Sequence, residues 1–258
     1  MKLSSYKLGE GSRPTVLLHG FMGQGKNLRT LAQKWSERDP SRVFLVPDLR
    51  GHGTSPAADE QTTLAVMARD VLETARAEGF SGPLDFVGHS QGGRVSLAAL
   101  GAAPEEVGQV VLLDIGPGPI DSRKSESARV LDLLLLAPDS AKERRELRAF
   151  LLDRGLSPSL TDWLMMNVVH ENGEYRWRID RTSLGQLHVR LNSEDLWPVV
   201  EKFGGRIRCI RGARAHYVTD ADKERLERAG CRVDTVQSGH YVHVEALDAI
   251  LDLLTGAR

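Results

Sequence analysis

The stretch LDFVGHSQGGRVSLAAL, residues 84 to 100, joins an apolar run to a helical pattern through the short segment Gly88–Gly92. The apolar run has the continuity of a buried strand, and residues 94–102 have helical periodicity. Glycines on both sides of Ser90 allow a sharp turn, because a Cβ at either position would collide with the strand or the helix. A serine at such a turn presents its hydroxyl at the end of a sheet. The pattern G-x-S-x-G therefore predicts a nucleophilic serine, and the alternative is a glycine-lined turn whose serine caps a helix.

Five further apolar runs end, like the run before Ser90, in small or polar residues. They span residues 15–20, 43–48, 110–114, 207–212 and 233–237. Near-continuous apolarity is typical of parallel strands that are covered on both faces. Helical patterns lie among these runs at 28–38, 64–78, 94–102, 221–229 and 244–254. The alternation of strand and helix predicts an α/β fold with a doubly wound, mostly parallel sheet.

The alternation fails once, between about residues 120 and 203. This segment has no convincing buried strand, and its amphipathic patterns are broken by Pro138, Pro158 and the turn-like Glu171–Gly173. We expect a helical insertion that covers the carboxyl ends of the strands. The expected domains are an α/β core of residues 1–119 and 204–258 and a helical cap of residues 120–203.

Composition disfavours several classes of function. A net charge of −1 over 258 residues creates no field that would attract nucleic acid or an anionic membrane. Cys209 and Cys231 lie in apolar, strand-like runs, which predicts buried thiols rather than a disulfide or a metal site. The beginning of the chain lacks the apolar region of a secretory signal, and the apolar run at 131–137 is too short to span a bilayer. We therefore expect a cytoplasmic protein without a membrane span, of undetermined oligomeric state.

Two further motifs extend the pattern around Ser90. His19–Phe21 follows the apolar residues TVLL at 15–18, and Asp48–Gly53 is followed by Ser55. The first resembles the HG motif, and the second the structural D-x-R-G-x-G-x-S turn, of the serine hydrolases with the α/β-hydrolase fold. The resemblance covers nearly the whole chain. It implies an oxyanion hole formed by the backbone amides of Phe21 and Gln91, the latter at the positive end of a helix.

Eight histidines compete for the role of the general base that activates the serine. In the α/β-hydrolase fold the chain order is serine, acid, histidine, so the base belongs to the loop after the last strand. His240 follows Gly239 in that loop and resembles the family's G-H-x-x-x-x-E pattern, whereas His243 falls in the next helical segment. We predict His240 as the base. The other histidines lack metal-site spacing, and we expect neither a metal nor a cofactor.

The position of the acid departs from the commonest family pattern. The loop after the run at 207–212 lacks a carboxylate at the expected place, and Asp220 falls late, in the first turn of a predicted helix. Asp114 ends the run at 110–114 and precedes the rigid turn at 115–119. The stretch LLDIGP is similar to the D-I-x-P signature of a branch of small bacterial esterases and acyl thioesterases. We predict Asp114 as the acid, with two alternatives: Asp220 is the acid, or Asp114 only caps its turn.

These residues together predict hydrolysis of a small-molecule carboxylic ester or acyl thioester through an acyl-enzyme on Ser90. Apolar cap segments at 130–136, 147–152 and 163–169 can roof a pocket. The candidate substrate-binding residues, each also explained by ordinary packing, are Met22, His19, Met165 and Met166. The candidate contacts for the phosphates of a coenzyme A thioester are Arg123, Lys124 and Arg129.

Other functions fit parts of the sequence. Residues 20–27, GFMGQGKN, nearly match the phosphate-binding loop G-x-x-x-x-G-K-[ST], but Asn27 replaces the required hydroxyl residue. The missing acid after the run at 207–212 favours a hydrolase-like scaffold that binds a ligand without catalysis. The same framework also serves C–C bond hydrolysis and perhydrolysis, and the motifs do not separate these from ester hydrolysis.

Overall fold

The computed structural model describes residues 1–121 and 126–256. Within them, seven strands form the main sheet in the order β1-β3-β2-β4-β5-β9-β10, and every pair is parallel except β1 with β3. The predicted mostly parallel sheet is confirmed. Its strands are β1 (Ser5–Leu8), β2 (Arg13–Leu18), β3 (Arg42–Pro47), β4 (Leu84–His89), β5 (Val107–Leu113), β9 (Ile207–Gly212) and β10 (Arg232–Val236).

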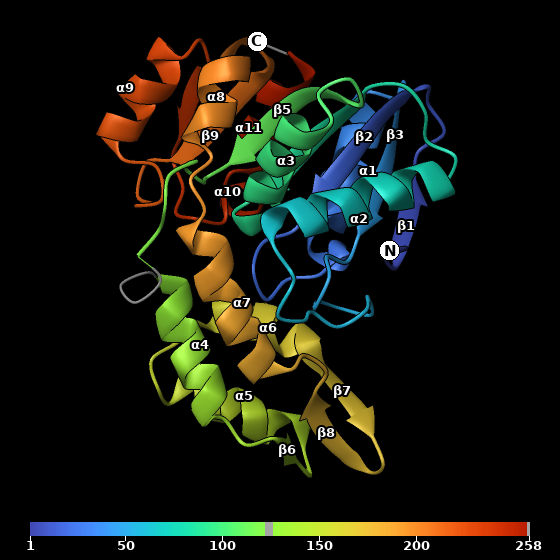
Figure 1. Ribbon diagram of the computed structural model, residues 1–258. Coiled ribbons are helices and arrows are strands. Elements are labelled where there is room, and N and C mark those ends of the chain that lie inside the picture. The colour runs from blue at the N-terminus through green and yellow to red at the C-terminus, as the bar shows by residue number, and fades with distance from the viewer. Residues whose placement is uncertain (122–125, 257–258) are drawn as a thin grey trace.

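Helices cover both faces of this sheet (Figure 1). In β2, Val16 and Leu18 pack in the hydrophobic cluster that includes α2 and α3, whereas Leu17 packs with α1 and α11 on the opposite face. Burial on both faces explains why the strands read as unbroken apolar runs. The core helices are α1 (Arg29–Arg38), α2 (Leu64–Ala77), α3 (Gln91–Ala102), α8 (Trp197–Phe203), α9 (Asp220–Arg228), α10 (Val242–Glu245) and α11 (Leu247–Thr255), with 3-10 turns η1 (Gly25–Leu28) and η3 (Gly204–Arg206).

Two core elements differ from the expectation. The sequence did not predict β1, a four-residue edge strand whose side chains are only partly buried and which therefore leaves no apolar run. The helix expected at 244–254 is divided at Ala246, where φ is −134° and ψ is 40°. Cys209 and Cys231 are buried and free, as predicted. Across the two described stretches of the chain, no helix is both long and apolar enough to cross a membrane.

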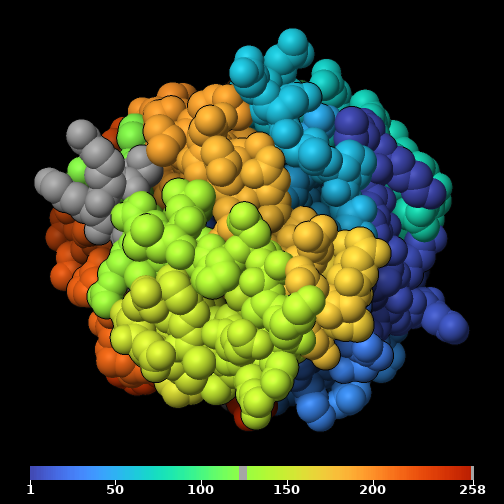
Figure 2. All heavy atoms as spheres, turned by 90° about the horizontal axis from the view of Figure 1, so that it is seen from below, coloured from blue at the N-terminus to red at the C-terminus, as the bar shows by residue number. Residues whose placement is uncertain are grey.

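Residues 126–193 form a second layer at one end of the core (Figure 1). Viewed from below, atoms of this segment spread over that end of the molecule (Figure 2). The segment expected to be helical also contains a three-stranded antiparallel sheet, in the order β6-β8-β7. Its elements are α4 (Glu126–Leu136), β6 (Ser140–Ala141), α5 (Arg144–Leu152), α6 (Pro158–Leu164), η2 (Met165–Asn167), β7 (Val168–Glu171), β8 (Glu174–Trp177) and α7 (Arg181–Ser193).

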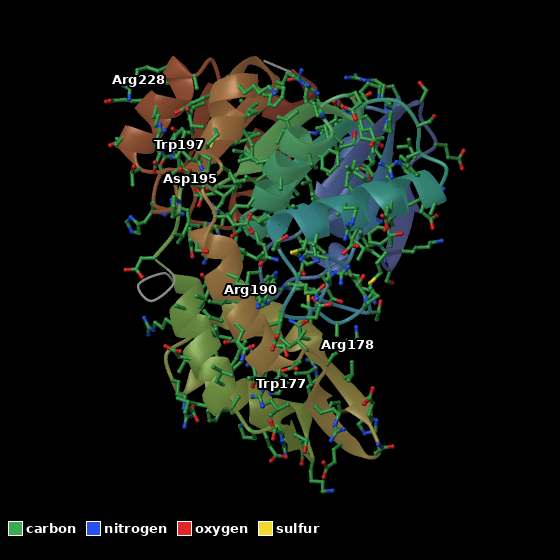
Figure 3. The ribbon with its side chains drawn as sticks, viewed as in Figure 1. Trp177, Arg178, Arg190, Asp195, Trp197 and Arg228 are labelled. Carbon is green, nitrogen blue, oxygen red and sulfur yellow. The ribbon has the colours of Figure 1, made fainter. Side chains whose placement is uncertain are left out.

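The turn between β7 and β8 was visible in the sequence. Asn172 and Gly173 both have positive φ, 52° and 78°, as the two central residues of a tight hairpin require. Figure 3 shows Trp177 within this second layer and Trp197, at the start of α8, beside the core. The helix α8 contacts α3, which places it with the core helices.

Two connections join the layers and run side by side. Ile120 N donates to Asn192 O at 2.9 Å, and Leu196 N donates to Pro117 O at 2.9 Å. Arg94 of α3 holds both connections from the core side, and only 1% of this residue is exposed. Its position is one helical turn after Ser90. The connections to the second layer are therefore fastened to the helix that follows the serine.

The Arg94 guanidinium donates to four backbone carbonyl oxygens. Nη1 donates to Gly116 O at 3.3 Å and to Gly118 O at 2.7 Å, on the entering connection. Nη2 donates to Leu191 O at 3.2 Å and to Glu194 O, on the returning connection. Burial lowers the pKa of Arg94 to about 10, so the group is still charged at neutral pH. A buried cation at the carboxyl end of α7 also complements the helix dipole.

We expect Arg94→Met to lower the free energy of unfolding by about 3 kcal/mol, because buried carbonyl oxygens lose their donors. Urea denaturation measures the loss. Hydrogen–deuterium exchange should rise first in segments 116–120 and 191–196. The matched control is Arg228→Met, because Arg228 is exposed and pairs with Glu224 only across 3.7 Å. Equal destabilisation by both substitutions would contradict this role of Arg94.

Candidate active site

Ser90 lies at the turn between β4 and α3, with φ 51° and ψ −119°. A non-glycine residue at positive φ is strained by about 1–3 kcal/mol. Its N–H donates to Leu113 O of β5 at 3.1 Å, which fixes the turn to the neighbouring strand. A Cβ at Gly88 would lie 2.3 Å from the backbone of Gly92, and a Cβ at Gly92 would lie 2.3 Å from Leu18 O. The steric reason for the two glycines therefore holds in the structure.

Asp114 follows β5 and is fully buried, also with positive φ, at 53°. Its Oδ1 accepts from Gly212 N at 2.8 Å, and its Oδ2 lies 2.7 Å from His240 Nδ1. A Cβ at Gly212 would lie 2.3 Å from Gly239 O, so this glycine allows the histidine loop to approach. An imidazole that donates its Nδ1–H to a carboxylate keeps Nε2 as a proton acceptor.

Asp220, the alternative acid, lies elsewhere. Its side chain is 86% exposed and pairs with Arg211 Nη2 at 2.7 Å. It begins α9, and Thr219 caps that helix by accepting from Asp222 N. The carboxylate that contacts His240 is therefore that of Asp114.

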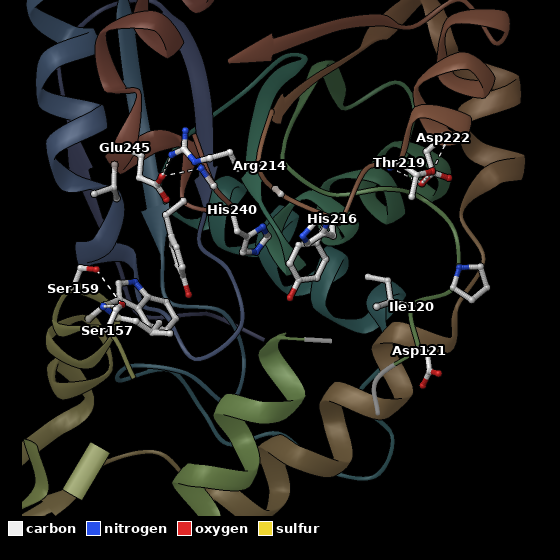
Figure 4. A pocket seen from close by; sticks show the side chains of 18 residues that line it. Ile120, Asp121, Ser157, Ser159, Arg214, His216, Thr219, Asp222, His240 and Glu245 are labelled. Atoms are coloured by element: carbon white, nitrogen blue, oxygen red, sulfur yellow. Dashed lines mark hydrogen bonds and ion pairs between the residues drawn. The ribbon is translucent and has the colours of Figure 1, made fainter. Parts of the chain in front are cut away.

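Three cavities surround these residues. The outer cavity, of about 670 Å³, is lined by His240 but not by Ser90. The serine cavity, of about 30 Å³, is lined by both Ser90 and His240. The Gln91 cavity, of about 10 Å³, is lined by Ser90, Gln91 and Phe21 but not by His240. Figure 4 shows the outer cavity, with His240 between the Arg214–Glu245 pair on one side and Ile120 on the other. Ser90 and His240 therefore line the same cavity, the serine cavity.

Phe21 and Gln91 are the two residues expected to supply amides to an oxyanion. Gln91 is the first residue of α3, where backbone N–H groups and the helix dipole favour negative charge. Phe21 is buried, and its ring centroid lies 4.2 Å from that of His188 in α7. Both residues line the Gln91 cavity. An oxyanion next to Ser90 needs N–H donors directed at it, and the oxyanion hole formed by Phe21 and Gln91 stays a prediction.

Two buried histidines with lowered pKa values, His89 and His243, lie close to His240. His89 Nε2 lies 3.0 Å from His240 O, and the rings of these two residues are 4.6 Å apart. Burial, reinforced by the neighbouring His243 and His240, lowers the pKa of His89 well below its ordinary value. Burial also lowers the pKa of His243 to about 3. His89 thus orients the backbone of the loop and adds no charge to it.

Of the four predicted substrate-binding residues, Met22 lines the serine cavity. His19 does not line any of the three cavities. Its Nδ1 is 2.8 Å from Gly20 O, and its Nε2 accepts from Leu49 N at 2.9 Å. This buried imidazole therefore joins the loops after β2 and β3, and burial lowers its pKa.

Met165 and Met166 also lie outside the walls of the three cavities. Met165 is fully buried, and its carbonyl oxygen accepts from Arg144 Nη2 at 2.8 Å. Met166 O accepts from Gln24 Nε2 at 3.1 Å, and its sulfur lies 3.2 Å from Asn27 Nδ2. Met166 thus helps to dock the second layer on residues 20–27, whereas Met165 accepts a hydrogen bond from within the second layer.

Residues 20–27 resembled a phosphate-binding loop in the sequence. In the structure Gly25 N donates to Asp48 Oδ1 at 2.8 Å, so a carboxylate of the protein itself occupies this loop. Asp48 also accepts from Thr54 N at 2.8 Å, and Arg50 pairs with Asp70 at 2.6 Å. Asp48 and Arg50 therefore tie loops together, as the sequence implied.

Several residues that the sequence did not indicate reach the site from the second layer and its neighbouring loop. Ser127 Oγ of α4 lies 2.8 Å from His188 Nε2 of α7, and burial lowers the pKa of His188 to about 4. Tyr217 lies in the loop expected to hold the acid, and its ring is 4.0 Å from that of His240. Trp163 of α6 begins the apolar segment 163–169, which was expected to roof a pocket, and it lines both the outer and the serine cavity. No local pattern marks Ser127, His188 or Tyr217, because packing between layers brings them together.

Of the three candidate phosphate contacts, one lies among the described residues. This residue, Arg129, does not line any of the three cavities. Arg123 and Lys124 lie outside the described residues. Within residues 1–121 and 126–256, no group of three or more His, Cys, Asp and Glu side chains is arranged to hold a metal ion.

Comparisons with known proteins agree with this architecture. Among solved structures, a marine microorganism esterase has a TM-score of 0.85 at 24% identity, covering 99% of this chain and 98% of its own. Lipase LipV of Mycobacterium tuberculosis is 31% identical over 81% of this chain and 78% of its own length. The sn-1-specific diacylglycerol lipase ABHD11 of Xenopus laevis is 27% identical over 97% of this chain and 82% of its own length. The family described as Alpha/beta hydrolase family matches residues 15–253. Because this match spans nearly the whole chain and the sheet order agrees with it, the chain belongs to the α/β hydrolase family.

Proposed function

We propose that the protein is a serine hydrolase that cleaves carboxylic esters or acyl thioesters through an acyl-enzyme on Ser90. The observation that carries the proposal is the 2.7 Å contact between Asp114 Oδ2 and His240 Nδ1, at a cavity that Ser90 also lines. The names of the relatives, lipase and esterase, support an ester as the substrate class. The substrate is a small molecule, and the proposed steps use no cofactor.

Each residue has a defined part in the proposed reaction. Ser90 Oγ attacks the acyl carbonyl while His240 Nε2 takes its proton. Asp114 keeps the proton of His240 on Nδ1 and stabilises the imidazolium that forms. The amides of Phe21 and Gln91 donate to the oxyanion. His240 then protonates the leaving group, and afterwards it activates the water that hydrolyses the acyl-enzyme.

We propose the expected domains, in which residues 1–119 and 204–258 form the core that carries the catalytic groups and residues 120–203 form the cap. The helix α8 falls within the bounds of this cap but contacts α3 of the core. The part of the cap that covers the catalytic groups is therefore the second layer, residues 126–193. Ser127, Val130 and Trp163 of the cap line the serine cavity. The loop after β9 lacks the expected acid, which favoured a scaffold without catalysis. Asp114, which follows β5, supplies a carboxylate to His240 instead.

A fluorophosphonate probe should label the wild-type protein, because an activated serine attacks it, and should not label Ser90→Ala. Mass spectrometry of the labelled peptide measures this. A wild-type protein that hydrolyses no ester and takes up no probe contradicts the proposed function.

Asp114→Asn should lower kcat for p-nitrophenyl acetate by about 10³–10⁴, because the amide favours the wrong tautomer of His240. Steady-state kinetics of purified variants measures the loss. Asp220→Asn is the matched control, and its activity should stay near that of the wild type because Asp220 is exposed and pairs with Arg211. Loss of turnover in Asp220→Asn with normal turnover in Asp114→Asn would overturn the assignment of the acid.

Five buried histidines other than His240 have lowered pKa values, and burial is the largest cause for each. The pKa values of His52 and His243 fall to about 3, and that of His188 falls to about 4. The whole group is His19, His52, His89, His188 and His243. In the unfolded chain a histidine has a pKa of about 6.5, so below that pH the unfolded state binds protons that the folded state does not.

The free energy of unfolding should therefore be highest above about pH 6.5, and it should fall by about 2 kcal/mol for each of His52, His188 and His243 by about pH 5. Urea denaturation across this range measures it. His243→Phe should reduce the slope of the free energy of unfolding against pH by about 1 kcal/mol per pH unit, because one titrating group is removed. His216→Phe, at an exposed position, is the control and should leave the slope unchanged. A stability that does not change below pH 6.5 would show that these side chains are protonated in the fold.

A further inference from the structure

The three cavities adjoin one another and differ in which of the two proposed reacting residues they touch. Tyr217 lines all three, and Ile120 lines the outer and the Gln91 cavity. The outer cavity touches His240, the serine cavity touches both His240 and Ser90, and the Gln91 cavity touches only Ser90 of the two. Trp163 and Tyr241 line both the outer and the serine cavity, and their ring centroids are 5.6 Å apart. The site is therefore divided by an aromatic boundary close to His240.

The chemistry of acyl transfer determines which part of a substrate each cavity holds. The oxyanion must face the amides of Phe21 and Gln91, and the leaving atom must face His240, which protonates it. The alcohol or thiol part of a substrate then extends past His240 into the outer cavity. The acyl part stays bonded to Ser90 and occupies the serine and Gln91 cavities.

The sizes of the cavities differ greatly. The serine and Gln91 cavities hold about 30 Å³ and 10 Å³, and a cavity needs about 10–15 Å³ to hold one water molecule. Met22 and Val130, in the wall of the serine cavity, are 2% and 7% exposed and leave little space for a chain. The outer cavity, at about 670 Å³, has the size of a typical small-molecule site.

The lining of the outer cavity is mostly apolar. Aromatic and aliphatic side chains come from the cap and from both loops near His240: Ile120, Leu160, Trp163, Tyr217, Tyr241 and Val244. Charged groups in its wall are partly satisfied within the protein. Arg214 pairs with Glu245 at 3.0 Å, and Asp222 accepts from Thr219 Oγ1 at 2.7 Å (Figure 4). This surface suits an apolar or aromatic group better than a phosphate.

We propose that the site cleaves esters that join a small acyl group, of about acetyl size, to a bulky and mostly apolar alcohol. This inference rests on the proposed serine hydrolysis and assigns the two parts of the substrate to different cavities. Val130 limits the length of the acyl group, and Leu160 contacts only the alcohol.

Two ester series test the assignment on the full-length protein. In the first, naphthylmethyl acetate, butyrate and octanoate vary only the acyl group. In the second, methyl, benzyl and naphthylmethyl acetates vary the alcohol at similar acidity of the leaving group. We expect kcat/KM to fall by about tenfold or more from acetate to octanoate, and to rise by about tenfold or more from methyl to naphthylmethyl, which is about 1.4 kcal/mol each.

Two conservative variants then separate the cavities. Val130→Ala enlarges the serine cavity, and we expect it to raise the octanoate-to-acetate ratio of kcat/KM by about fivefold without changing the alcohol series. Leu160→Ala alters only the outer cavity, and we expect it to change the alcohol series and not the acyl series. Circular dichroism and urea denaturation show that each variant is folded.

Failure of this inference differs from failure of the proposed function. A higher kcat/KM for octanoate than for acetate, together with equal kcat/KM for all three alcohols, overturns the assignment of the cavities but not the proposed serine hydrolysis. Variants that lose activity equally on every ester also overturn it, because neither position then selects a part of the substrate. Absence of turnover on both series, together with absence of fluorophosphonate labelling, overturns the proposed function and this inference together.

Discussion

The carboxylate of Asp114 accepts hydrogen bonds at the point where three segments of the chain meet. It receives the Gly212 amide at the end of β9 and the His240 imidazole from the loop after β10, while its own backbone ends β5. A fully buried carboxylate is tolerated only when hydrogen bonds satisfy it. The position of the imidazole, and with it the proposed chemistry of Ser90, depends on this one carboxylate and its hydrogen bonds.

The same edge of the sheet holds three strained residues, Met22, Ser90 and Asp114. All three have positive φ, and Ser90 N donates to Leu113 O, immediately before Asp114. Such conformations persist because the surrounding structure determines them. Closely packed glycines at positions 88, 92 and 212 make that packing possible, since side chains there would overlap neighbouring backbone. Rigidity at this edge holds the proposed reacting groups in place before a substrate binds.

The core and the second layer contribute different properties to the site. Ser90, Asp114 and His240 come from the ends of parallel strands, whereas Val130 and Trp163 reach the cavities from helices of the second layer. Arg94 couples the two layers, because its guanidinium binds the connections on both sides of that layer. A family that keeps its core and varies its cap can therefore change substrate selection without altering the reacting groups.

The sequence by itself determined the parallel sheet and the strained turn at Ser90, because these depend on local patterns: unbroken apolar runs and glycines where a side chain would collide. It also identified Asp114 and His240 as candidates, but their contact spans 126 residues and needed the tertiary structure. The strands β1, β6, β7 and β8 are too short or too exposed to leave a pattern. Only the tertiary structure decided that Tyr217, Trp163 and Ser127 line the cavities and that Met165 and Met166 do not. The physical reason is that the cavity walls depend on how the core and the second layer pack against each other.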